Sequence, residues 1–317
     1  MFIKEKTNKG LTQFELRSLY SSLLHSIFLF FLFMCHIEKK NRIPLWSDLL
    51  LLILGFFFGA LIAEECTLSL LGSTGYENDQ YYLLSAILSC SMVSLVILFL
   101  HYIIDKRPLR ELGLCSFNKL RKYSKIIILW TIIVFTLGLI ICILSGSANI
   151  SAVQLHWEDL SLSLIMFIFG AFYEEILIRG YLLTRLCRSG LNIWISLSIT
   201  SLIFSALHLA NPDMSICSAV NLFLGGFFDG CIFLLTGSLW SAVISHCAWN
   251  WIQGSIFGFN VSGGEFYQSL ITLEYPSYNL INGGVFGFEG SIICTILLLP
   301  SVFVLMKLVS KNLKKNV

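Results

Sequence analysis

The stretch AFYEEILIRG, residues 171–180, places two adjacent carboxylates and an arginine inside a long apolar run. Each charge at bilayer depth costs roughly 2.5 to 3.5 kcal/mol on insertion scales. A membrane segment keeps such residues only where they are paired, exposed to water or functional. The stretch therefore indicates either a buried ion-pair cluster or a reaction site, and the rest of the chain decides between the two.

The composition of the chain is that of a membrane protein. Of its 317 residues, 56% are hydrophobic and 13% are charged, whereas soluble domains carry about 25% charged residues. The formal net charge of +2 gives no electrostatic basis for a nucleic-acid partner. The ten cysteines include no CxxC pair, and most lie in apolar runs, where cysteine behaves as a small hydrophobe.

Hydropathy predicts an all-α, polytopic transmembrane helical bundle. A helical span needs about 20 apolar residues, and in lipid only helices and closed barrels satisfy their own backbone groups. The pattern favours eight core spans and one additional N-terminal hydrophobic segment at 19–37. The eight core spans are 46–63, 83–104, 126–146, 160–182, 192–210, 215–235, 238–254 and 284–306.

The charges of the loops predict the orientation of the core spans. Lys and Arg gather in the linker 105–125, before the turn at Ser189-Gly190 and in the C-terminal tail. The segments on the opposite side carry acidic residues and no Lys or Arg: 64–82, 147–159, 211–214 and 255–283. The positive-inside rule therefore places the basic loops and the C-terminus in the cytoplasm. Basic residues flank 19–37 on both sides, so this segment either spans the bilayer or lies in its interface.

Charged and polar residues inside the spans form a constellation. Glu175 and Arg179 lie four apart on one helical face, in the favourable order for an ion pair. Glu174 is rotated by about 100° from Glu175, so it has no partner within its own helix and is suited to act as a general base or acid. Asp229 is a further acid within a span, and the sequence assigns it no role.

Helical geometry brings Glu174 level with His208. The turn at Ser189-Gly190 predicts an antiparallel helical hairpin, and the two residues lie roughly 23 and 28 Å from that turn at helical rise. His246 and Asn250 are also four apart on one face, where imidazole and amide groups can stabilise an oxyanion. Each feature alone is typical of a packed core residue or a structural ion pair. Their occurrence in neighbouring helices favours a site for water attack on a carbonyl.

These motifs resemble those of the CPBP family, the CAAX protease and bacteriocin-processing intramembrane proteases, also known as the Abi or type II CAAX prenyl endopeptidase-like group. The motifs are listed here in chain order: Glu174-Glu175-x-x-x-Arg179, Phe204-x-x-x-His208, Gly226-x-x-x-Gly230 followed by Thr236-Gly237-Ser238-Leu239, and His246-x-x-x-Asn250. The resemblance is clear over about 165–255 and extends weakly to the basic residues 107–114.

The resemblance implies roles for the motif residues. Glu174 would activate water with His208, and His246 and Asn250 would hold the oxyanion. Glu175, Arg179 and Phe204 would support the site. Members of the family are described as metal-dependent, and the residues alone also allow a three-ligand site for zinc or another divalent metal at Glu174, His208 and His246, with one open position. The enzyme would thus be a metalloendopeptidase or a glutamate-type peptidase.

On this basis the chain divides into four segments. These are an N-terminal segment at 1–45, N-terminal transmembrane helices at 46–146, a CPBP-like catalytic core at 147–256, and an external loop with the last span and a basic tail at 257–317.

We expect a multi-pass protein of a bacterial cytoplasmic membrane. Its substrate would be a peptide or membrane protein, and its function bacteriocin processing, immunity or other peptide processing. Two rival hypotheses are a non-catalytic immunity or regulatory protein of the same fold and a proton-coupled transporter, which the absence of an internal repeat disfavours.

The depth of the site in the bilayer is estimated in two ways that disagree. Counting helical turns from Gly190 places Glu174 in the half of the bundle remote from that turn, toward the outside. Arg179, if it reaches for the headgroups, instead places the glutamates near the inner boundary.

Overall fold

The computed structural model describes residues 80–104, 106–114 and 120–315, together with the single residues 62 and 66. The expected segment 19–37 and nearly all of the expected span 46–63 lie outside the described residues. Everything below concerns the unit that begins at Leu45.

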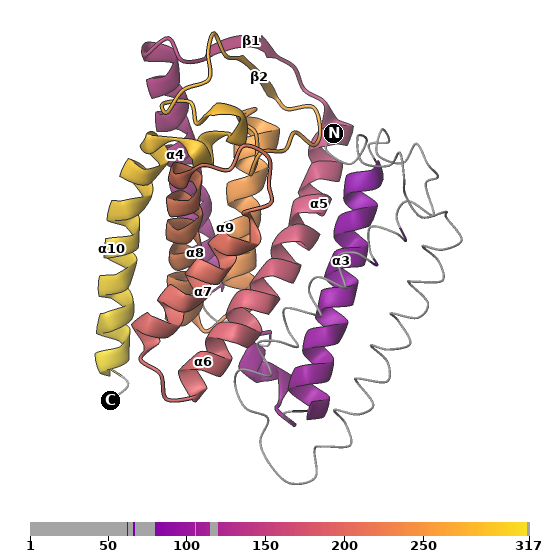
Figure 1. Ribbon diagram of the computed structural model, residues 1–317, viewed down its shortest axis with the longest axis vertical. Coiled ribbons are helices and arrows are strands. Elements are labelled where there is room, and N and C mark those ends of the chain that lie inside the picture. Colours follow the sequence, from indigo (N-terminus) through magenta and orange to yellow (C-terminus); the bar gives the residue numbers. More distant parts are fainter. Residues whose placement is uncertain (1–61, 63–65, 67–79, 105, 115–119, 316–317) are drawn as a thin grey trace, which may run out of the picture. The chain divides into compact units, whose positions relative to one another are not determined.

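The described part of the chain is a bundle of helices (Figure 1). Its α-helices are α3 (Gln80–Leu98), α4 (Leu120–Leu144), α5 (Trp157–Glu175), α6 (Thr184–Arg188), α7 (Ile193–Leu207), α8 (Ile216–Thr236), α9 (Leu239–Trp251) and α10 (Ile292–Lys315). Wider π-helical turns continue three of them: η3 (Phe99–Ile104) follows α3, η5 (Ile176–Leu183) joins α5 to α6, and η6 (Ile252–Ile256) follows α9. Short 3-10 turns are η4 (Leu109–Leu112), η7 (Gly284–Phe286) and η8 (Phe288–Gly290).

The expected class, a polytopic transmembrane helical bundle, is confirmed, but the count of eight spans is not. Within the described residues, five helices are long and apolar enough to cross a membrane. They are Leu83–Ile103, Leu120–Leu144, Trp157–Arg188, Ile216–Thr236 and Ile292–Lys314. The expected spans 192–210 and 238–254 correspond to shorter helices, α7 of 15 residues and α9 of 13 residues.

The start of the last expected span, at residue 284, is wrong. Gly283, Gly284 and Gly287 all have positive φ angles, which interrupt helical geometry. Residues 284–290 therefore form the 3-10 turns η7 and η8, and α10 begins only at Ile292.

A two-stranded antiparallel sheet, which the sequence reading did not anticipate, covers one end of the bundle. Strand β1 (Asn149–Val153) pairs with β2 (Ile271–Glu274), with a register shift between Ile150 and Ala152. Figure 1 shows both strands at the upper end of the bundle. Neither strand lies in an apolar run long enough to span a membrane. The sheet therefore does not change the helical class of the bundle.

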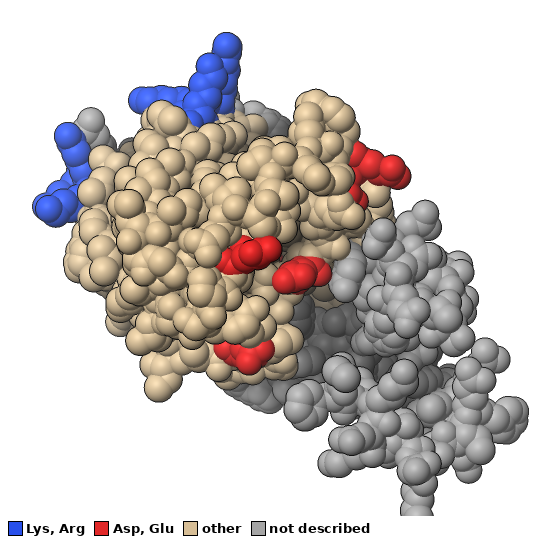
Figure 2. Space-filling model, turned by 90° about the horizontal axis from the view of Figure 1, so that it is seen from above, with Lys and Arg blue, Asp and Glu red and all other residues tan. Residues whose placement is uncertain are grey.

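The sheet-bearing end is acidic. Glu158, Asp213, Glu265 and Glu274 are exposed, and Figure 2 shows acidic side chains across this end, with Lys and Arg visible only at the edge of the view. At the opposite end, Arg188 of α6 forms an ion pair with Glu111 of η4. This separation of charges along the bundle is the pattern on which the predicted orientation rests.

Close packing of α7 on α8 depends on small residues. A Cβ atom at Gly226 would lie 3.2 Å from Cδ1 of Phe204, and one at Gly230 would overlap the side chain of Leu197. Small residues at these two positions therefore let the two helices approach closely. Gly237 has a φ of 66° and ends α8 at a tight turn, after which α9 begins at Leu239.

Candidate active site

Glu174 and Glu175 are the last two residues of α5, where the chain changes from α-helical to π-helical winding. α5 ends at Glu175, and the π-helical segment η5 follows directly. Such widened turns are rare and frequently occur at functional sites. Adjacent residues of an α-helix point about 100° apart, so Glu174 and Glu175 face different neighbours.

Glu175 and Arg179 form the expected ion pair, and both are buried, with exposed fractions of 0% and 1%. Arg179 Nη1 donates to Glu175 Oε1 at 2.6 Å, and Nη2 donates to the carbonyl of Gly226 at 2.8 Å. The guanidinium also lies over the ring of Phe204, 4.8 Å from its centroid. The charge of Arg179 is therefore satisfied inside the bundle and does not require the headgroups.

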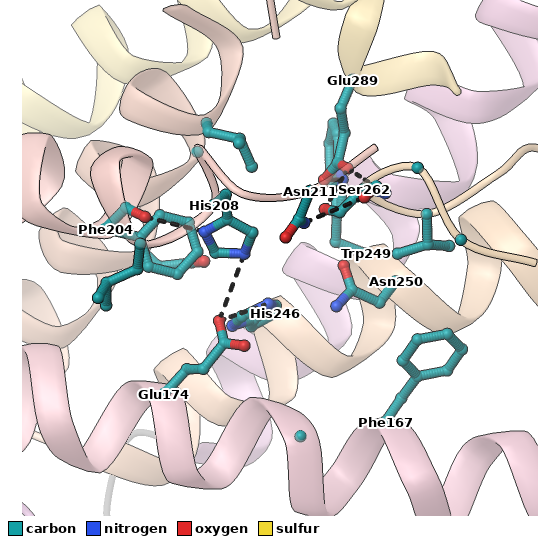
Figure 3. Close-up of a pocket in the computed structure, with 18 of the residues that line it drawn as sticks. Phe167, Glu174, Phe204, His208, Asn211, His246, Trp249, Asn250, Ser262 and Glu289 are labelled. Atoms are coloured by element: carbon teal, nitrogen blue, oxygen red, sulfur yellow. Dashed lines mark hydrogen bonds and ion pairs between the residues drawn. The ribbon is translucent and has the colours of Figure 1, made fainter. Parts of the chain in front are cut away.

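Glu174 faces both histidines across a cavity (Figure 3). Its Oε2 lies 3.9 Å from Nε2 of His208 and 3.9 Å from Nε2 of His246. The same oxygen is buried and has no hydrogen-bond partner among the described residues. Separations of 3.9 Å are too long for direct hydrogen bonds and suit one water molecule bridging the carboxylate and an imidazole.

His208 directly follows the last residue of α7, and a contact with that helix fixes the orientation of its ring. Nδ1 lies 2.9 Å from the carbonyl oxygen of Phe204, which can only accept, so we assign the proton to Nδ1. The two rings of Phe204 and His208 pack with centroids 4.8 Å apart. In the neutral ring, Nε2 therefore carries a free lone pair directed toward Glu174.

His246, on α9, is oriented by the buried ion pair. Its Nδ1 lies 3.0 Å from Glu175 Oε1 and donates to that carboxylate. Its ring also meets Phe204 edge to face, with centroids 5.7 Å apart. Asn250, one turn further along, lines the same cavity and stands beside it in Figure 3.

The cavity has a volume of about 490 Å³. Its wall includes Asn211, Pro212, Gly263 and Phe266, which belong to loops at the sheet-bearing, acidic end. The estimate from turn counting, which placed Glu174 in the half of the bundle remote from Gly190, agrees with this arrangement.

Residues 155–252 match the family model described as type II CAAX prenyl endopeptidase Rce1-like. The match covers about a third of the chain and shows that this segment is similar to the Rce1-like family. The resemblance expected from the motifs is therefore confirmed, and the matched segment contains all four proposed catalytic residues, Glu174, His208, His246 and Asn250. No curated protein and no solved structure matches the chain. The family that this segment resembles is, by its description, one of prenyl endopeptidases.

Asp229 of α8 joins the Rce1-like site, which sequence reasoning did not foresee. It is buried, with 8% of its surface exposed, and it lines the cavity. One oxygen of Asp229, one of Glu175 and one nitrogen of His246 lie within 4.8 Å of one another. The signal in the sequence was an acid three residues after Gly226 on the face of α8 that meets Arg179.

These three side chains have the spacing of a metal site, but the surrounding chemistry opposes a cation. Glu175 Oε1 already accepts from the guanidinium of Arg179 at 2.6 Å and from His246. A metal ion there would lie beside a fixed positive charge and would have to displace these donors. We therefore conclude that Glu175, Asp229 and His246 form a charge cluster with Arg179 and do not fit a metal.

The metal set expected from the sequence, Glu174, His208 and His246, fits in one respect. Both imidazoles direct Nδ1–H to a carbonyl or carboxylate and leave Nε2 facing Glu174, an arrangement common around metal-bound histidines. Within the described residues, however, this set is not among the groups whose ligand atoms lie within 4.8 Å of one another.

A second group missed by sequence reasoning lies on the opposite wall of the cavity. Glu289 of η8, Ser262 and Asn211 all line it beside Trp249 and Asn250. Each belongs to a segment that the helical motifs do not reach. No periodicity or spacing in the sequence connects them.

Proposed function

We propose that this chain is an intramembrane endopeptidase that hydrolyses a peptide bond in a peptide or membrane-associated protein, with Glu174 as the general base. The observation that carries the proposal is the position of Glu174 Oε2. It is buried without a hydrogen-bond partner among the described residues and lies 3.9 Å from Nε2 of each histidine.

Water activation follows from this placement. A water molecule between Glu174 and His208 can donate one proton to the carboxylate and the other to Nε2 of His208, which is an acceptor because Nδ1 is protonated. Its oxygen then attacks the scissile carbonyl carbon as Glu174 takes its proton. Collapse of the tetrahedral intermediate breaks the C–N bond, and Glu174 returns the proton to the departing amine.

The oxyanion is assigned to His246 and Asn250. Because Nδ1 of His246 donates to Glu175, Nε2 can also donate only if the ring is an imidazolium. We propose that form, since Glu175 is a carboxylate placed to stabilise it and Glu174 is a second one nearby. The amide of Asn250, on the same face of α9, supplies the second donor.

Glu175, Arg179 and Phe204 act as the support for these groups. Arg179 holds Glu175 and the backbone of α8 together, and Glu175 in turn orients His246. Phe204 packs against both imidazoles and the guanidinium. Preorganised donors of this kind cost no rearrangement during the reaction.

The substrates proposed are bacteriocin precursors, signal peptides or similar peptides at a bacterial cytoplasmic membrane. The cavity of about 490 Å³ is lined by apolar side chains such as Met166, Phe167 and Phe228 as well as by the polar site, which suits an apolar peptide segment. Should a divalent metal bind at Glu174, His208 and His246, it would supply a more acidic bound water.

The experiment that tests this function is peptide turnover by the purified protein in lipid. Candidate membrane peptides are incubated with wild type and with Glu174→Ala, and cleavage sites are mapped by mass spectrometry. Cleavage by wild type alone supports the peptidase. Tight peptide binding by both proteins without cleavage by either would instead identify an immunity or regulatory protein of this fold.

A further inference from the structure

Glu289 is a buried carboxylate on the wall of the candidate active site, yet the proposed chemistry does not use it. It lies in η8, between the external loop and α10, outside the segment that matches the Rce1-like family. Only 7% of its surface is exposed. A buried carboxylate is costly unless its oxygens are fully hydrogen-bonded.

Three donors meet the two oxygens of Glu289. The indole Nε1 of Trp249 donates to Oε1 at 3.1 Å. The backbone N–H and the hydroxyl of Ser262 donate to Oε2 at 3.0 and 2.9 Å. The indole and the backbone amide are donors that cannot accept, so each oxygen of Glu289 must be an acceptor.

These hydrogen bonds connect α9, which carries His246 and Asn250, with the C-terminal end of α7, where His208 lies. Trp249 immediately precedes Asn250 on α9. The carbonyl of Ser262 accepts from Asn211 Nδ2 at 3.1 Å, and the backbone N–H of Asn211 donates to the carbonyl of His208 at 3.0 Å. Figure 3 shows Glu289, Ser262, Asn211 and Trp249 together along the wall that faces Glu174.

The backbone of Glu289 is itself anchored to α8. Asn221 Nδ2 donates to the carbonyls of Glu289 and Ser291 at 2.7 and 2.8 Å. The amide oxygen of Asn221 accepts from Thr295 at 2.6 Å. Glu289 is therefore a fixed point to which both the end of α7 and the end of α9 are tied.

We propose that Glu289 is a positioning residue that sets the separation of His208 and Asn250 across the cavity. The proposal is tested in two ways. The kinetic test rests on the peptidase function proposed above, and the distance measurement rests on geometry alone. Effects of this kind are large, because a misplacement of about 1 Å in a site costs about 100-fold in rate.

Glu289→Gln is the sharpest variant because it keeps the size of the side chain and changes one acceptor into a donor. Whichever way the amide turns, its NH2 meets either the indole N–H of Trp249 or the backbone N–H of Ser262. In the double variant Trp249→Phe/Glu289→Gln, the NH2 turns toward the phenyl ring and the amide oxygen keeps Ser262. We therefore expect partial rescue, which a loss of general packing would not give.

The kinetic test measures kcat and KM for a cleaved peptide. We expect Glu289→Gln to lower kcat about 10- to 100-fold with KM nearly unchanged, and the double variant to exceed Glu289→Gln in kcat. Glu274→Gln, an exposed acid of β2, is the matched control and should behave as wild type. Wild-type kcat in Glu289→Gln, or a double variant no better than it, overturns the proposal.

The geometric test does not depend on catalysis. Genetically encoded amino acids that carry spin labels replace two exposed residues, Leu209, which is 63% exposed, and Glu265. Pulsed electron resonance then measures the distribution of distances between the two labels. Glu289→Gln should broaden it, and Glu274→Gln should not. If Glu289→Gln does not fold, Asn211→Asp, which sets a carboxylate against the carbonyl of Ser262, should broaden it equally. An unchanged distribution in the folded variant overturns the proposal, whereas a wild type that cleaves no peptide contradicts only the peptidase function.

Discussion

Glu174 Oε2 lies 3.9 Å from Nε2 of His208, although the two residues belong to opposite arms of a helical hairpin. The hairpin turns at Gly190, whose φ of 88° is a conformation that favours glycine. The residues therefore meet because both arms are helical and nearly equal in length between the turn and the site. The relationship also separates Glu174 from its neighbour Glu175, which faces Arg179 and His246.

The two glutamates should respond differently to the same substitution. Glu174→Gln is expected to abolish peptide cleavage and leave thermal stability unchanged, because it removes the base and keeps the shape. Glu175→Gln is expected to lower the free energy of unfolding by about 3 kcal/mol, the lower end for a broken buried pair, because Asp229 remains near Arg179. Cleavage assays and thermal unfolding in detergent measure the two effects. Full activity in Glu174→Gln would show that another group is the base.

The orientation of the bundle can be tested at two exposed serines in a background without native cysteines. Ser151 lies in β1 at the acidic end, and Ser189 lies in the turn beside the basic residues of α6. The positive-inside rule places the acidic end outside. An impermeant thiol reagent added to intact cells should label Ser151→Cys and spare Ser189→Cys. Labelling of Ser189→Cys alone would reverse the assigned orientation.

Close packing of α7 on α8 predicts that two glycine positions of α8 differ in their tolerance of alanine. A Cβ at Gly230 would overlap Leu197, which is fully buried, whereas one at Gly225 would meet no atom within 4 Å. Gly230→Ala should therefore destabilise the protein by about 1–3 kcal/mol through overpacking. Gly225→Ala should be neutral or stabilising by up to about 1 kcal/mol, since alanine favours helix. Equal unfolding temperatures for the two variants would contradict the observed interface.

The sequence predicted the motif-bearing part of the site because its geometry is helical. Glu175 with Arg179 and His246 with Asn250 are pairs within single helices, so a spacing of four residues places each on one face. Glu174 and His208 needed one further assumption, a tight turn at Gly190, and the turn is present. The contact of Arg179 with Gly226 was not predicted, because hydropathy cannot distinguish an arginine that reaches the headgroups from one that donates to groups inside the bundle.

The rest of the site arises from tertiary packing that no local pattern encodes. Asp229 acquires its neighbours only because α8 packs against α9 and against η5, which carries Arg179. Glu289 reaches Trp249 and Ser262 because three glycines with positive φ, at 283, 284 and 287, turn the chain back over the cavity. The same glycines delay the start of α10, which hydropathy placed several residues too early.

The two models for His246, oxyanion donor and metal ligand, predict different effects of its substitution. As a clamp, His246 should contribute only to rate: His246→Ala is expected to lower turnover roughly 100- to 1,000-fold with the metal content of the purified protein unchanged. As a ligand, it should be required for a stoichiometric metal. Metal analysis and turnover are therefore measured together on His246→Ala and His208→Ala.

Asn250→Ala is the informative partner in that experiment, because an amide is a poor metal ligand beside imidazole and carboxylate. If His246 and Asn250 hold one oxygen, the two single variants should lose similar amounts of activity, and the double variant should lose much less than their product. We expect this result, because both residues line the same side of the cavity one helical turn apart. Stoichiometric zinc that disappears in both histidine variants but persists in Asn250→Ala would establish the metal site instead.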